Sequence, residues 1–197
     1  MIDKLLSLDT DLLIYLNGLG SKTYDGMWLL ITNQLNWTPL FLLLLYVIMK
    51  KIGTKQTLFF LLGLGLLIAF SDQVTNLFKN NFQRLRPCNN PEIKEIIRLV
   101  QIRSSYSFFS GHAATSMAST MFIYHNIKRY FKNVYLLFLW PLIFAYSRIY
   151  LGLHYPIDIL TGYTFGAISG YAAYRIFRVY QHKYFPIIAV EAVEVEA

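Results

Sequence analysis

The sequence predicts an all-α membrane protein, in which about five transmembrane helices form a bundle and an amphipathic helical region precedes them on the membrane surface. Hydrophobic residues make up 55% of the 197 residues, and the mean hydropathy is +0.41. Lysines and arginines gather in the gaps between long apolar stretches. These features are typical of an integral membrane protein, and they exclude disordered, collagen-like and disulfide-built chains. Residues 1–185 are expected to form one domain, and residues 186–197 an acidic, disordered tail.

The longest apolar run, residues 56–78, predicts one span. As a helix it would be roughly 34 Å long, which is enough to cross the hydrocarbon core. Residues 37–49 are shorter and reach a spanning length when the helix is extended back through residues 27–36. Three further apolar segments bring the predicted count to five spans: 113–127, 134–151 and 157–177.

Small residues indicate how the later spans pack. The segment 113–127 is rich in Ala, Ser and Thr, which suit close helix contacts inside a bundle better than contact with lipid. Gly162, Gly166 and Gly170 recur every four residues, so they share one face of the last span. We therefore expect a neighbouring helix to pack closely along that face.

The first 35 residues differ from the spans because their leucines share helical faces with charged residues. The charged residues are Asp3, Lys4, Asp9 and Asp11. Such an amphipathic segment lies on a membrane more readily than it crosses one.

The short loops carry basic clusters, which should face the cytoplasm. The clusters comprise Lys50, Lys51 and Lys55, then Lys128, Arg129 and Lys132, and finally Arg175, Arg178 and Lys183. The long segment 79–112 then faces outward, although it is also basic, and the acidic N-terminal region is placed outside with it. The net charge of +7 points to anionic lipid or phosphate rather than nucleic acid, because apolar segments separate the basic residues.

Three polar motifs fall at the outward-facing ends of the predicted spans. They are KNNFQRLRP at 79–87, SGH at 110–112 and SRIYLGLHYPID at 147–158. Taken singly, their residues have ordinary structural explanations: a Lys or Arg at a helix end reaches toward the interface, Ser110 caps a helix, and Asp158 favours a helix N-terminus. Together they converge on one membrane face, which indicates a shared site.

The combined residue types fit a pocket that binds a phosphate group and attacks it. Donors for the phosphate oxygens would come from Lys79, Arg86, Ser110, Gly111 and Arg148. Asp158 follows His154 by one helical turn and should hold the proton on one imidazole nitrogen, which leaves the other nitrogen as the nucleophile. His112 then remains to protonate the leaving oxygen.

Asp72 lies outside the motifs but within a predicted span, where an unpaired carboxylate would cost on the order of a few kcal/mol. Lys79 follows seven residues later, on nearly the same helix face. We expect Asp72 to position the cationic pocket through an ion pair or hydrogen bonds. The alternative is that it bonds only Ser71, Asn76 or a neighbouring helix.

The motifs resemble the signatures K-x6-RP, PSGH and SR-x5-H-x3-D of the type 2 phosphatidic acid phosphatase superfamily, over residues 20–180 or so. The resemblance implies a membrane phosphatase that needs no metal or other cofactor and forms a phosphohistidine intermediate. His154 matches the family's nucleophile, Asp158 the partner of that nucleophile and His112 the acid for the leaving group. The phosphate-binding positions are matched by Lys79, Arg86, Ser110, Gly111 and Arg148.

Phe109 departs from the family pattern, which commonly has Pro before SGH, and this bears on the rigidity of the loop. The chain resembles most the small bacterial lipid phosphatases. That resemblance implies a location in the bacterial inner membrane, with the active site on its outer face.

The motifs leave the substrate open among several lipid phosphates. These are an isoprenyl diphosphate such as undecaprenyl diphosphate, phosphatidylglycerol phosphate, phosphatidic acid and a lipid A phosphate. Helix grooves and the loop 88–109 would select among them. The expected partners are the substrate and membrane lipids, without nucleic acid, and the oligomeric state is open. Cys88 is the only cysteine, so no internal disulfide forms.

Three other functions share parts of this pattern. A non-catalytic lipid-phosphate binder or transporter needs the cations, but it does not need an oriented pair such as His154 and Asp158. Vanadium haloperoxidases share the oxyanion pocket but are soluble. A metal-dependent phosphatase is disfavoured because Glu92 and Glu95 are the only paired acids in the outer loop and no cluster has the spacing of metal ligands.

Overall fold

The structure, a computed structural model, describes residues 2–185, and all regular secondary structure within them is helical. This confirms the predicted fold class. The predicted acidic tail, 186–197, lies outside the described residues. The helices are α1 (Ile2–Gly18), α2 (Asp25–Thr32), α3 (Thr38–Ile52), α4 (Thr54–Phe82), α5 (Gly111–Ile127), α6 (Leu139–Tyr150) and α7 (Pro156–Tyr184), with short 3-10 turns η1 (Lys22–Tyr24), η2 (Gln34–Trp37), η3 (Pro87–Asn89) and η4 (Val134–Phe138).

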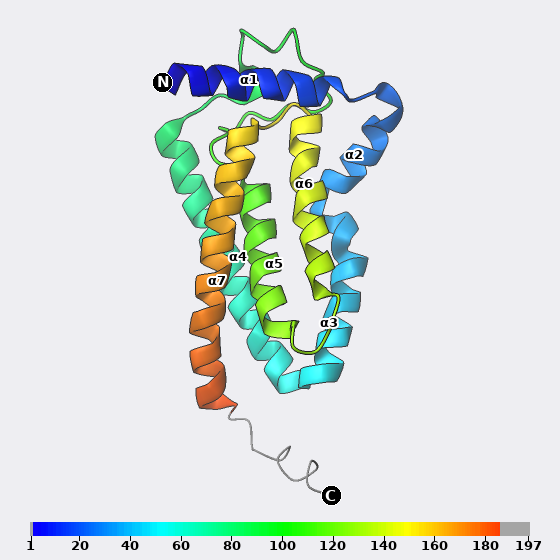
Figure 1. Cartoon of the computed structure of the whole chain (residues 1–197), viewed down its shortest axis with the longest axis vertical. Helices are drawn as coiled ribbons and strands as arrows, with labels where there is room; N and C mark the ends of the chain where they lie inside the picture. The colour runs from blue at the N-terminus through cyan, green and yellow to red at the C-terminus, as the bar shows by residue number, and fades with distance from the viewer. Residues whose placement is uncertain (1, 186–197) are drawn as a thin grey trace, which may run out of the picture.

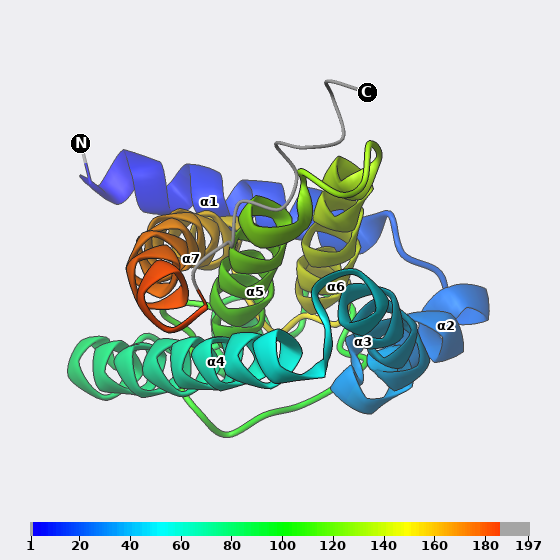
Figure 2. The same ribbon diagram turned by 90° about the horizontal axis from the view of Figure 1, so that it is seen from below.

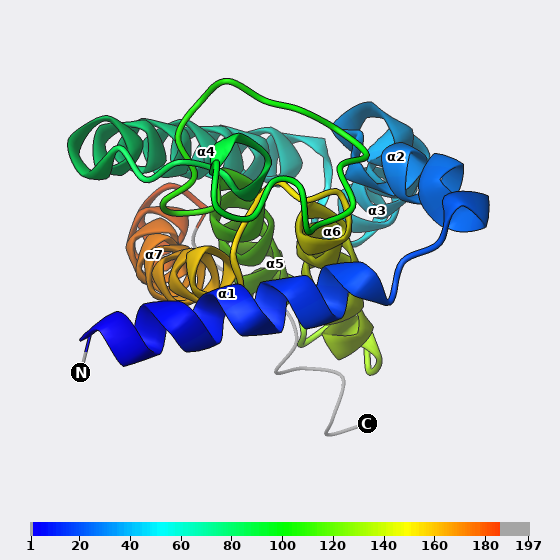
Figure 3. The ribbon, with the colours of Figure 1, turned by 90° about the horizontal axis from the view of Figure 1, so that it is seen from above.

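The helices α3 to α7 run side by side along the long axis, and α1 lies across one end of them (Figure 1). Seen from above, α1 crosses α7 and α6 (Figure 3), and it contacts both helices. The α3–α4 and α5–α6 connections lie at the opposite end, as does the last turn of α7 (Figures 1 and 2). The basic short loops therefore share one end of the bundle, as their sequence positions predict.

The outer faces of the bundle are apolar. Two helical segments, Gln34–Ile52 and Thr54–Asn89, are long and apolar enough to cross a membrane, and Val134–Tyr150 is a shorter apolar helix. Large hydrophobic side chains on α4 and α7, such as Leu66 and Ile168, are exposed. Apolar surface of this kind suits contact with lipid. The crossing of all five helices α3 to α7 remains a prediction.

The expected continuous helix over residues 27–49 is wrong, because the chain is divided there into α2, η2 and α3. Asn33 has extended backbone angles, and its side chain accepts a hydrogen bond from the Leu35 N–H (3.1 Å). This local bond competes with helix continuation. Pro39 then stands in the first turn of α3, where its missing N–H is tolerated.

The glycine face of α7 packs directly on α5, as predicted. A Cβ atom added to Gly166 would clash with the Ala114 carbonyl oxygen, and one added to Gly162 would lie 2.7 Å from the Ser110 carbonyl oxygen. Any side chain here would force the helices apart. Close packing therefore fixes the start of α5 beside the start of α7.

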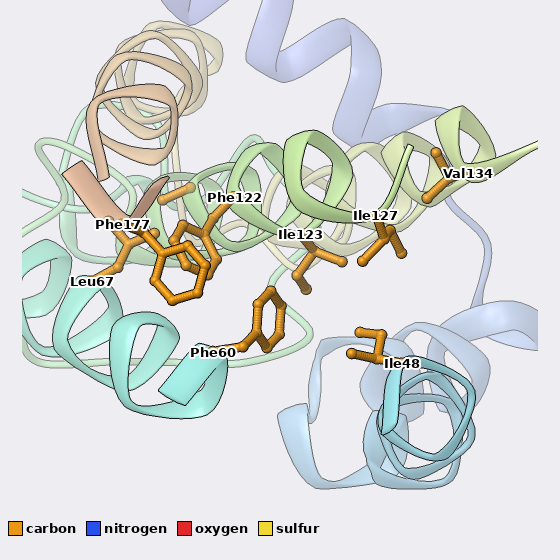
Figure 4. Packing of buried hydrophobic residues seen from close by; sticks show 9 residues of the cluster. Ile48, Phe60, Leu67, Phe122, Ile123, Ile127, Val134 and Phe177 are labelled. Carbon is orange, nitrogen blue, oxygen red and sulfur yellow. The ribbon is translucent and has the colours of Figure 1, made fainter. Parts of the chain in front are cut away.

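A buried hydrophobic cluster stabilises the end of the bundle that lies opposite α1 (Figure 4). Its members come from α3, α4, α5, η4 and α7: Ile48, Phe60, Leu67, Ala118, Phe122, Ile123, Ile127, Val134 and Phe177. At the other end, α1 buries Leu13 together with two polar side chains, Asp9 and Asn17. Leu8 and Leu12 of α1 are exposed. This arrangement agrees with a helix that rests on the bundle in the plane of the membrane surface.

Candidate active site

The predicted site residues lie together at the end of the bundle that α1 covers. They stand at helix ends, with Lys79 in the last turn of α4, Ser110 as the N-cap of α5, Arg148 in the last turn of α6, and Asp158 in the first turn of α7. The residues 151–155 join α6 to α7 and carry His154. The structure thus brings all three motifs to one place.

His154 is 1% exposed, and both of its ring nitrogens have a partner. Arg86 Nη1 lies 2.8 Å from His154 Nε2, and Asp158 Oδ2 lies 3.3 Å from His154 Nδ1. Because a guanidinium only donates hydrogen bonds, Nε2 is the acceptor and the proton is on Nδ1, facing Asp158. Burial, together with the charge of Arg86, lowers the pKa of His154 well below its usual value. The ring is therefore neutral at neutral pH, with its lone pair directed at Arg86.

Asp158 is completely buried, and both of its carboxylate oxygens have hydrogen-bond partners. Its Oδ2 atom also accepts the Tyr155 N–H (3.1 Å), which forms part of a capping box at the start of α7. Its Oδ1 atom accepts a hydrogen bond from Arg84 Nη1 (2.8 Å). These bonds fix the carboxylate and so the tautomer of His154.

Three cations of the site have no carboxylate partner within the described residues 2–185. Arg86 (4% exposed) donates to the backbone oxygens of Ser105 and Leu153, at 2.7 and 2.9 Å. Arg148 (3% exposed) donates to the Thr32 hydroxyl, and its buried Nε atom has no partner among those residues. Buried cations without counter-charges are costly, so this pocket is suited to an anion.

Lys79, in the last turn of α4, is the third cation of the site and lies next to the start of α5. A Cβ atom on Gly111 would lie 3.7 Å from Lys79 Nζ, an ordinary contact, and 3.3 Å from the Thr75 methyl group, a tight one, so Lys79 Nζ lies beside the first residue of α5. The Ser110 side chain accepts the Ala113 N–H (3.4 Å). The N–H groups of Gly111 and His112 precede this capped position and have no acceptor within α5, which is a favourable arrangement for a phosphate oxygen.

His112 stands one residue inside α5. Its ring stacks on Phe144, with centroids 5.0 Å apart. None of the hydrogen bonds found within residues 2–185 involves its ring nitrogens. The ring is thus held by packing, while its nitrogens remain available to an oxygen of a bound molecule.

Residues 58–181 match the PAP2 superfamily, the type 2 phosphatidic acid phosphatases. The chain belongs to the PAP2 superfamily. It is 33% identical over 181 residues to the lipid A 4'-phosphatase of Bacteroides thetaiotaomicron, covering 89% of this chain and 80% of the relative. It is 29% identical over 182 residues to the lipid A 4'-phosphatase of Porphyromonas gingivalis, with 89% and 75% covered.

Two solved PAP2-type structures have the same fold. The transmembrane PAP2 type phosphatidylglycerolphosphate phosphatase from Bacillus subtilis aligns with a TM-score of 0.69 and 19% identity, over 93% of this chain and 89% of that one. Aquifex aeolicus LpxE aligns with a TM-score of 0.67 and 23% identity, over 85% and 95%. The family match and the lipid phosphatase relatives show that the chain is an integral membrane lipid phosphatase of the PAP2 type.

Asp72 does not form the ion pair expected with Lys79. It is exposed, and it accepts a hydrogen bond from Asn76 Nδ2 (3.1 Å). Asn76 lies one turn along the same helix, so the hydrogen bond of this carboxylate is local. The alternative interpretation of this residue is the one the structure supports.

Phe109, which stands where PAP2 proteins commonly have Pro, is 1% exposed. Its ring packs against Phe78 of α4 and Phe165 of α7, with centroids 5.2 Å away in each case. Aromatic packing therefore fixes the residue that enters the SGH motif.

Four residues of the PAP2 site were missed by sequence reasoning. Arg84 bonds Asp158, and it also bonds Asp9 of α1 (2.7 Å). Ser105 and Thr32 hold the guanidinium groups of the two pocket arginines. Arg84 lies inside the first motif, so its charge was a usable signal, whereas Asp9, Thr32 and Ser105 lie outside the motifs and carry no local signal. No group of three or more His, Cys, Asp or Glu with metal-binding geometry occurs within residues 2–185.

Proposed function

We propose that the chain removes a phosphate from lipid A, at the 4' position, through a covalent phosphohistidine on His154. The observation that supports this most directly is a pair of buried arginines, Arg86 and Arg148, without a carboxylate partner within residues 2–185, beside a histidine whose Nε2 lone pair points at Arg86. A site that only binds lipid phosphate has no need for the Asp158 contact that fixes this tautomer.

The proposed reaction has two displacements on phosphorus. His154 Nε2 attacks, a P–N bond forms, the bond to the lipid oxygen breaks, and His112 gives that oxygen a proton. Water then attacks the phosphohistidine, the P–N bond breaks, and His112 takes the proton from water. Lys79, Arg86 and Arg148 bind the other phosphate oxygens through both steps, and their charge balances that of the transition state.

The relatives and a groove beside the site support this choice of substrate class. The lipid A 4'-phosphatases match across nearly nine-tenths of this chain. An apolar groove of about 370 Å³ runs between α3 and α4 and is lined by Thr115 and Ser116 of α5 and by Phe144. Thr115 and Ser116 lie about one helical turn after His112, and Phe144 stacks on the His112 ring. Acyl chains that lie in this groove would place a headgroup phosphate at the cations.

We also place this site on the outer face of the bacterial inner membrane. The basic clusters of the short loops lie at the end of the bundle opposite to α1 and to the site. Positive loops of this kind stay on the cytoplasmic side during insertion. The site at the opposite end would then face the periplasm.

The test is phosphate release by the purified protein from a panel of lipid phosphates. The panel contains bis-phosphorylated lipid A, phosphatidylglycerol phosphate, phosphatidic acid and undecaprenyl diphosphate, and mass spectrometry identifies which phosphate lipid A loses. The expected result is a preference for lipid A with loss from the 4' position. Preferred hydrolysis of another lipid, or loss from the 1 position, would contradict the substrate assignment. Binding of all four without turnover would contradict the enzyme mechanism and favour a binder or transporter.

A further inference from the structure

Two charged side chains near the nucleophile, Asp9 and Arg84, take no part in the mechanism above. The Asp9 side chain is fully buried, and the Arg84 side chain is 21% exposed. Arg84 donates to Asp9 Oδ2 at 2.7 Å and to Asp158 Oδ1 at 2.8 Å, and its guanidinium lies 3.8 Å from the centre of the Tyr155 ring. Asp9, Arg84 and Asp158 therefore form one continuous chain of contacts that leads to His154.

We propose that Asp9 is a positioning residue that sets the basicity of His154 through Arg84 and Asp158; this inference rests on the proposed role of His154. With both carboxylates charged, the group of Asp9, Arg84 and Asp158 carries a net charge of −1. Without Asp9, Arg84 would pair with Asp158 alone and cancel its charge. Asp9 thus leaves Asp158 able to stabilise the positive charge that develops on His154 as it attacks.

The surroundings of His154 make this extra negative charge important. The charged and titratable groups that face it are Lys79 of α4, Arg84 and Arg86 of the following segment, His112 of α5, Arg148 of α6 and Asp158 of α7. Four of these six are cations that disfavour a positive imidazole. A single carboxylate already paired with Arg84 offers little compensation.

The same aspartate also fixes the geometry. Asp9 Oδ1 accepts the backbone N–H of Ile157 at 2.8 Å, so α1 is bonded to the first turn of α7, next to Asp158. Burial raises the pKa of Asp9, and the hydrogen bonds from Arg84 and from the Ile157 N–H oppose that rise. A helix on the membrane surface is thereby connected to the nucleophile through two side chains.

The test compares pH–rate profiles of Asp9→Asn, Arg84→Gln and the double variant in the full-length protein. Removing the Asp9 charge should lower kcat roughly three- to thirtyfold at the plateau, with little change in KM, and move the acid limb roughly half a unit to one unit lower. The double variant restores the net charge of −1, so the limb should return to the wild-type position. Substrate ionisation is common to all variants and cancels in the comparison.

Asn17→Ala is the matched control for loosening of α1. Asn17 is buried in α1 and donates to the backbone oxygens of Ile149 and Tyr150, at 3.1 and 2.9 Å, without a charge. Its loss should leave the acid limb in place. The inference is overturned if Asp9→Asn leaves the limb unmoved, if Asn17→Ala moves it equally, or if the double variant is no better than Asp9→Asn. Turnover that survives the His154→Ala substitution in an otherwise wild-type protein would instead overturn the proposed function itself.

Discussion

Replacing Asp158 by Asn tests whether this carboxylate orients His154 and stabilises the positive charge that develops on its ring during attack. The change conserves shape but removes one negative charge 3.3 Å from His154 Nδ1. At an effective dielectric constant of about 20, the attraction between charges at this distance is about 5 kcal/mol, which corresponds to a factor of about 5,000 in rate. The amide oxygen retains part of that attraction, so the expected loss in kcat is about 10³-fold.

The tautomer of His154 contributes to the same loss. In the Asp158→Asn variant, the introduced amide can present only one oxygen, whereas Arg84 and His154 Nδ1 both require an acceptor. If the oxygen turns to Arg84, the amide N–H₂ faces Nδ1 and the proton moves to Nε2, where it blocks attack. The variant is therefore impaired in either orientation.

The assay is kcat of the purified variant on an activated aryl phosphate, because such a leaving group needs little protonation and reports on the nucleophile. Removal of one partner from a buried ion pair costs about 3–5 kcal/mol of stability, so thermal unfolding must show that the variant is folded. Asp25→Asn is the matched control, because Asp25 forms an ion pair with Arg98 (2.8 Å) and neither residue belongs to the site. The control should retain activity within about threefold. A folded Asp158→Asn variant with kcat within tenfold of wild type would refute this reasoning.

Four further predictions follow from the structure. Because the pocket's own cations supply the charge, activity should survive EDTA and be inhibited by vanadate, and its loss in EDTA with rescue by magnesium would contradict this. Gly166→Ala should lower the unfolding midpoint by several degrees, at a cost of about 1–3 kcal/mol, while Gly65→Ala, which has open space around it, should not; equal midpoints would show that α5 and α7 tolerate separation. Burial lowers the pKa of His154, so the nucleophile should stay neutral below pH 6.5. The midpoint of the acid limb of kcat/KM, corrected for substrate ionisation, should therefore lie below pH 6.5, and a midpoint above that value would contradict this. In intact cells that express a variant without Cys88, an impermeant thiol reagent added outside should label Glu95→Cys and spare Lys51→Cys. The reverse pattern would place the site in the cytoplasm.

The fold class could be predicted because lipid-facing helices expose their apolar side chains, and that pattern is visible in a single sequence. The glycine spacing of α7 was equally informative, since Gly162 and Gly166 meet backbone atoms of α5 directly. The break at Asn33 could not be predicted from hydropathy. It depends on one side-chain hydrogen bond within an apolar region.

The site could be predicted where its residues stand at helix ends within motifs, as His112 and His154 do. It could not be predicted where a partner comes from elsewhere in the chain. Arg84 meets Asp9 across 75 positions, and Arg148 meets Thr32 across 116. These contacts depend on how α1 and α2 dock, and the sequence holds no local sign of that docking. Cys88 is buried near the Arg103 carbonyl oxygen, which makes it a poor labelling site, and its burial could not be predicted from the sequence either.

The central claim, attack by His154, is tested most directly by trapping the phosphoenzyme. His112→Ala should accumulate it from a labelled aryl phosphate, because the first step needs little acid while the second step lacks its base. After an alkaline quench, which preserves phosphohistidine, mass spectrometry should find the phosphate on His154 and none in the His112→Ala/His154→Gln double variant. Phosphate on another residue such as Ser110, or steady turnover by the double variant, would contradict the account.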